Sequence, residues 1–173
     1  MGYAPAAKWF HWLTVPLLLG ALAFGLVIGH VRDADKMRFY QIHESLGALV
    51  FLLTLARLAV RLRHPPPPHP AIPAPMRRAA DAVHATLYLA LLAQPLLGFI
   101  GSNAWGFPMA GATAFLGFIH QPPFMAKNEA LGTLLLQLHQ WLGWTIAALV
   151  ALHVAAVVFH QAIRKDGTLL RMV

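Results

Sequence analysis

The stretch LHQWLGWTIAALVALHVAAVVFH, residues 138–160, decides the fold, because it is long, apolar and punctuated by histidines. His139, His153 and His160 lie 14 and 7 residues apart. On a helix that turns ~100° per residue, these gaps return each imidazole to within about 40° of the one before. His139 and His153 are then about 21 Å apart along the axis, at ~1.5 Å per residue. The spacing predicts two haem groups, one above the other, on a membrane-spanning helix, since imidazole is the usual axial ligand of electron-carrying haem.

The composition is typical of a protein that resides in a lipid bilayer. Of 173 residues, 58% are hydrophobic and only 11% are charged, which lies outside the range of soluble proteins. The absence of cysteine excludes disulfides, iron–sulfur clusters, thiolate zinc sites and covalently attached c-type haem. The net charge of +7 does not indicate a nucleic-acid partner, because the basic residues lie at the ends of apolar spans.

Four apolar segments are long enough to cross a bilayer, which requires about 20 helical residues. They lie at about 9–29, 42–62, 82–101 and 134–163. None shows the strict alternation of a barrel strand. We therefore expect an all-α integral membrane protein, a single domain over residues 1–173 with a bundle of four transmembrane helices.

The basic residues are distributed unequally between the two ends of these spans. Four would lie on one side of the membrane: Arg32, Lys36, Arg38 and Lys127. Nine would lie on the other side: Lys8, Arg57, Arg61, Arg63, Arg77, Arg78, Arg164, Lys165 and Arg171. The positive-inside rule therefore predicts that both termini are cytoplasmic.

The two long connections differ in character. Residues 64–76 contain seven prolines, which predicts a stiff, extended cytoplasmic linker. Residues 102–131 contain five large aromatic residues among glycines and prolines. This composition predicts a cap on the outer membrane interface, with a short helix near 112–118.

The predicted spans place six histidines at two depths in the membrane. The outer level has two: His43 and His139. The inner level has four: His11, His84, His153 and His160. The outer level thus has two candidates for the two axial positions of one haem, whereas the choice of ligands at the inner level stays open. Ionisable residues inside a membrane are costly and are functional by default. A proton relay or a path for a divalent metal is the alternative role.

Two glycines and one arginine accompany these histidines. Gly47 and Gly143 each follow an outer histidine by four residues, on the face where a macrocycle needs flat space. Small residues also let membrane helices pack closely, which is the alternative. Arg57 lies 14 residues after His43, so it suits a haem propionate one level deeper. The alternative is that Arg57 reaches the inner headgroups, as we expect of Arg61.

Five stretches of the chain resemble one known family. They are KWFHW at 8–12, QIHESLG at 41–47, VHATLYLALLAQPLLG at 83–98, the histidine-bearing span at 138–160 and RKDGTLLRMV at 164–173. Together they are similar to bacterial cytochrome b561, the small di-haem quinone-linked cytochromes, and above all to the members that oxidise superoxide. The resemblance implies a multi-pass protein of the bacterial inner membrane with two b-type haems.

The resemblance also implies roles for individual histidines. It assigns four of them as axial ligands of the haem irons: His43 and His139 for the outer haem, His11 and His153 for the inner haem. His84 and His160 are then left near a cytoplasmic quinone pocket, where imidazoles can donate protons because they titrate near neutral pH. A depth estimate leans toward His84 as an inner ligand, because His11 is only three residues past Lys8.

The implied activity is that of a superoxide:quinone oxidoreductase. Electrons would pass from a small anionic donor in the periplasm, superoxide, through both haems to ubiquinone. Four basic residues could form a positive mouth that attracts this donor: Arg32, Lys36, Arg38 and Lys127. The alternative is an electron-transfer subunit that anchors a separate dehydrogenase or hydrogenase.

Overall fold

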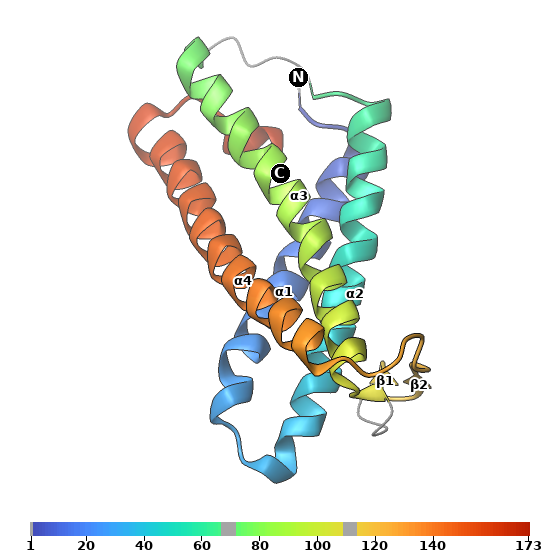
Figure 1. The fold of residues 1–173 in the computed structure, drawn as a ribbon. Coiled ribbons are helices and arrows are strands. Elements are labelled where there is room, and N and C mark those ends of the chain that lie inside the picture. The colour runs from blue at the N-terminus through green and yellow to red at the C-terminus, as the bar shows by residue number, and fades with distance from the viewer. Residues whose placement is uncertain (1, 67–71, 109–113) are drawn as a thin grey trace.

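The computed structural model describes residues 2–66, 72–108 and 114–173 and shows a bundle of four long helices (Figure 1). They are α1 (Pro5–Val27), α2 (Asp33–Arg63), α3 (Ala74–Trp105) and α4 (Glu129–Val158). All four are long and apolar enough to cross a membrane. The expected all-α architecture with four spanning helices is therefore confirmed.

The helices extend beyond the apolar windows into more polar turns. α2 begins at Asp33 rather than near residue 42, and η1 (Ile28–His30) and the π-helical η3 (Phe159–Arg164) continue α1 and α4. α3 begins at Ala74, so its first turn takes the last three residues of the proline-rich linker predicted at 64–76. Proline is tolerated there because the first turn leaves its backbone N–H groups without helical partners. Residues 67–71 of that linker lie outside the described residues.

The outer connection contains a small hairpin where the sequence predicts a short helix. β1 (Ala114–Phe115) pairs antiparallel with β2 (Ile119–His120). The turn between them has positive φ angles at Leu116 and Gly117, 55° and 80°, which a helix does not allow. The predicted helix near 112–118 is thus wrong from Ala114 onward, and residues 112 and 113 lie outside the described residues.

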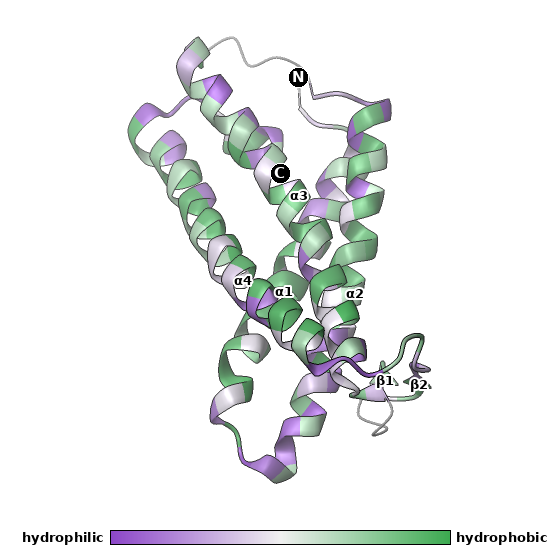
Figure 2. Ribbon diagram, in the orientation of Figure 1, coloured by the Kyte–Doolittle hydropathy of each residue, from purple (hydrophilic) through white to green (hydrophobic). Residues whose placement is uncertain are grey.

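α4 packs mainly against α3 and makes few contacts with α1 and α2. α1 packs along α2 and α3 packs along α4, with a smaller contact between α2 and α3. A central apolar cluster joins α2, α3 and α4: Val50, Ala90, Leu91 and Ile146. Large apolar side chains are exposed along the bundle, and Trp141 is 74% exposed. Figure 2 shows that hydrophobic residues make up most of each long helix. Such an outer surface is stable only against lipid.

Both chain ends lie at the same end of the bundle, opposite the hairpin (Figure 1). There the Tyr3 backbone N–H donates to the Arg171 carbonyl at 3.1 Å, and the Trp12 indole donates to the Met172 carbonyl at 2.8 Å. η4 (Leu169–Arg171) lies in this returning segment. We call this end the inner end and the hairpin end the outer end, following the orientation predicted from the basic residues.

Candidate functional site

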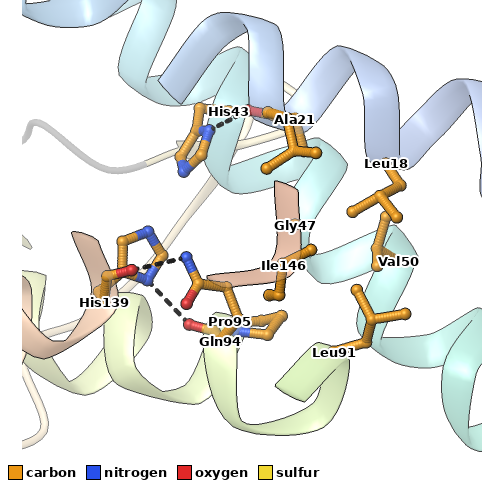
Figure 3. A pocket seen from close by; sticks show the side chains of 11 residues that line it. Leu18, Ala21, His43, Gly47, Val50, Leu91, Gln94, Pro95, His139 and Ile146 are labelled. Carbon is orange, nitrogen blue, oxygen red and sulfur yellow. Dashed lines mark hydrogen bonds between the residues drawn. The ribbon is translucent and has the colours of Figure 1, made fainter. Parts of the chain in front are cut away.

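The two outer histidines face one another across the bundle. His43 comes from α2 and His139 from α4, and their ring centroids are 5.8 Å apart with the planes at 83°. Figure 3 shows the two rings pointing toward one another at the edge of a small cavity. That cavity measures about 50 Å³ and its walls are mostly apolar. Its lining includes Gly47, next to which a Cβ would meet open space.

Hydrogen bonds fix how each outer ring is protonated. His43 Nδ1 lies 2.8 Å from the Ala21 carbonyl oxygen, and His139 Nδ1 lies 2.9 Å from the Gln94 carbonyl oxygen. A carbonyl oxygen can only accept, so Nδ1 of each ring carries the proton and donates it. The lone pair of each neutral ring is then on Nε2. Histidines that bind a metal through Nε2 are held in this way by a partner at Nδ1.

The residues at this level fit a haem iron. Two imidazoles that bind one metal from opposite sides, with bonds of about 2 Å, place their ring centres roughly 6 Å apart. The 5.8 Å between the outer rings matches that separation. The donor atoms are neutral nitrogens in apolar surroundings, which suits b-type haem.

Three histidines meet at the inner level. His153 contacts both of the others, with its ring centroid 6.3 Å from that of His11 and 5.5 Å from that of His84. Both separations are close to the roughly 6 Å expected for paired axial ligands. His153 is therefore common to either choice of ligands. Within the described ranges, no group of three or more His, Cys, Asp or Glu residues is arranged to hold a metal ion.

Arg57 reaches the inner level, but its partner is a histidine. Arg57 Nη2 donates to His11 Nδ1 at 3.1 Å, and its guanidinium lies 5.5 Å from the centre of the Tyr88 ring. Because Nδ1 of His11 accepts, the proton of this ring is on Nε2, opposite to the outer rings. The Arg61 guanidinium lies 5.8 Å from the centre of the same Tyr88 ring. The propionate role of Arg57 stays a prediction.

His160 is paired with a carboxylate just beyond the end of α4. His160 Nδ1 lies 2.6 Å from Asp166 Oδ2, and the two side chains are only 13% and 6% exposed. Arg164 Nε also donates to Asp166 Oδ2 at 3.1 Å. Burial raises the pKa of the Asp166 carboxyl, but hydrogen bonds from Thr168, His160 and Arg164 outweigh it and hold the pKa well below its usual range. Asp166 therefore stays ionised and orients the His160 imidazole.

The basic residues at the outer end are mostly paired with acids. Arg32 contacts Asp35 at 2.8 Å, Lys36 contacts Asp33 at 2.7 Å and Lys127 contacts Glu129 at 2.7 Å. These pairs are exposed, so each adds little stability. Their opposite charges nevertheless cancel at a distance. The acids therefore weaken the positive mouth predicted from the four basic residues.

Sequence reasoning missed three residues at the outer level: Gly25, Gln94 and Gly98. A Cβ on Gly25 or Gly98 would lie 2.9 Å from Cε1 of the adjacent histidine ring. Gln94 Nε2 donates to the His139 carbonyl at 2.9 Å, and a Cβ on Gly143 would meet that amide. Of these three, only Gln94 gave a signal in the sequence, because a polar side chain inside an apolar span requires a partner.

Four apolar helices with paired histidines facing inward at two depths define a membrane electron-transfer protein. The family model described as prokaryotic cytochrome b561 matches residues 2–173. The chain belongs to this family, which confirms the resemblance seen in the sequence. Membership establishes electron transfer in a multi-pass membrane protein and implies b-type haem.

The chain is similar over almost its full length to several bacterial proteins. Cytochrome b561 homolog 2 of Escherichia coli K12 is 32% identical, over 98% of this chain and 90% of that protein. Cytochrome b561 homolog 1 of the same organism is 30% identical, over 95% and 92%. The probable superoxide oxidase CybB of Yersinia pestis is 29% identical, over 94% and 90%.

Proposed function

We propose that this protein binds two b-type haems and transfers electrons from superoxide in the periplasm to ubiquinone at the inner end of the bundle. The observation that carries the proposal is the pair of histidine levels on α4, each facing an imidazole from another helix. Similarity to a probable superoxide oxidase supports the choice of donor, and the bacterial relatives support the inner membrane.

The proposed ligands are His43 and His139 at the outer level, and His153 with His11 at the inner level. For His11 to bind through Nε2, its proton would have to move to Nδ1, so the hydrogen bond from Arg57 would have to be released. Bound haem supplies a one-electron redox centre. With haem bound, the two imidazoles at each level would hold its iron, so superoxide would not bind the metal directly. The donor then gives up its electron from the outer surface. The apolar walls around the outer rings keep bulk water away from that level.

At the inner end we assign proton delivery to His160, assisted by His84. Quinone reduction consumes two protons for two electrons, and imidazole is the side chain best suited to supply them near neutral pH. The Asp166 carboxylate accepts from His160 Nδ1 and so leaves Nε2 to face the substrate. This is the arrangement of a general acid whose ring is held by a carboxylate behind it.

The decisive experiment uses protein purified in detergent with its native haem. We expect two haems per chain by pyridine haemochrome, a low-spin reduced-minus-oxidised spectrum, and reduction of a ubiquinone analogue with superoxide as sole donor. Colourless protein would contradict the proposal and favour a histidine-lined path for protons or metal. Haem reduction only with a co-purifying dehydrogenase would instead identify an anchoring subunit.

Replacing His160 with alanine is expected to slow quinone reduction by about tenfold or more, since general acids contribute at least that much. Both haems should remain, because His160 bonds to Asp166 and is not a proposed ligand. His64→Ala is the matched control, an exposed histidine at the same end of the bundle. The measurement is the rate of quinone reduction, with the haem-to-protein ratio alongside. Loss of a haem in His160→Ala would mean that ligand and quinone residues have been exchanged.

A further inference from the structure

The ring of His43 packs against the backbone of α1 at Gly25, where a side chain would leave it no space. Its acceptor is the carbonyl of Ala21, and four residues later along α1 comes Gly25. A Cβ on Gly25 would lie 2.9 Å from Cε1 and 3.3 Å from Nδ1 of the ring. Real Cβ contacts are longer, so any side chain at this position would push the imidazole away from the carbonyl.

The ring of His139 packs in the same way against the backbone of α3. Its acceptor is the carbonyl of Gln94, and the residue four positions later is Gly98. A Cβ on Gly98 would lie 2.9 Å from Cε1 and 3.0 Å from Nδ1 of this ring. The two outer rings are thus held on two different helices by the same pattern, an acceptor carbonyl followed four residues later by glycine.

The offset of four residues has a geometric cause. In an α-helix each carbonyl points along the axis toward the N–H of the fourth residue ahead. The side chain of that fourth residue stands beside the carbonyl oxygen and covers it from the outside. Glycine at that position uncovers the oxygen, which then accepts a second hydrogen bond from a neighbouring helix. Small residues also let membrane helices approach one another closely.

We propose that Gly25 and Gly98 are positioning residues for the outer haem. Each glycine keeps a backbone carbonyl accessible to an imidazole Nδ1–H, and so directs Nε2 of that ring toward the iron. Gln94 strengthens the arrangement on α3, because its side-chain amide also donates to the His139 carbonyl. The inference rests on the proposed di-haem function.

The test compares Gly98→Ala and Gly25→Ala with Gly29→Ala, whose added Cβ would meet nothing within 4 Å. A hydrogen bond at Nδ1 makes the imidazole a stronger donor to iron, which favours the ferric state. Each of the first two variants should therefore lower outer-haem content or raise its midpoint potential and change its low-spin EPR signal. The inner haem should keep its wild-type content, potential and signal, and Gly29→Ala should match the wild type throughout.

Three outcomes contradict the inference in different ways. If the outer haem of both Gly98→Ala and Gly25→Ala has wild-type content, potential and EPR signal, the role of the glycines is wrong while the proposed function still holds. Equal loss of both haems in these variants would also defeat it, because the glycines would then serve the fold as a whole. Wild-type protein without haem would defeat the proposed function and the inference together.

Discussion

Replacing His139 with alanine is expected to reduce the haem content from two per chain to one, with loss of the outer haem. His139 and His43 are the pair at that level, and no third histidine approaches either ring among the described contacts. An iron left with one imidazole binds weakly, because the small apolar cavity offers no replacement donor of equal strength. The measurement is the haem-to-protein ratio together with the reduced-minus-oxidised spectrum.

Two further variants make the His139 result specific. His43→Ala should give the same loss, because it removes the other ligand of the same iron. Gln140→Ala, at an exposed position next to His139 on α4, should keep both haems. Two low-spin haems in His139→Ala would contradict the outer assignment.

Replacing His153 with alanine is expected to remove the inner haem whichever histidine is its second ligand. His153 lies within pairing distance of both His11 and His84, at 6.3 and 5.5 Å between ring centroids. The outer haem should remain, since it would lie about 21 Å away along the helix axis. The measurement is again the haem ratio, with redox titration to show which centre is left.

His11→Ala and His84→Ala then decide the second inner ligand. We propose His11, so His11→Ala should lose the inner haem, and His84→Ala should keep it. The reverse result would exchange the two residues. In that case His11 would not bind the iron, and its hydrogen bond with Arg57 would lie beside the haem. Retention of two haems in His153→Ala would contradict the inner assignment altogether.

The helices and the two histidine levels could be predicted from the sequence because both depend on local properties. A run of apolar residues long enough to cross the bilayer forms a helix there, since backbone groups in lipid must bond within their own segment. The rise per residue then sets the depth of each histidine along its own helix. The ends of the helices were less predictable, because helices such as α2 continue past the apolar window into polar turns.

The hairpin at the outer end could not be predicted in the same way. β1 and β2 depend on a turn with positive φ at Leu116 and on a hydrogen bond from its backbone N–H to Ser45 Oγ, 71 residues away.

The sequence by itself determined that the chain has four spanning helices and that its histidines lie at two depths, because length, hydropathy and axial rise belong to each helix alone. Only the tertiary structure decided that His43 faces His139, that His153 contacts two rings, and that Gly25 and Gly98 stand beside the acceptor carbonyls. These features depend on the rotation of each helix about its axis and on which neighbour it packs against. Side chains distant in the chain set both, so no local pattern contains them.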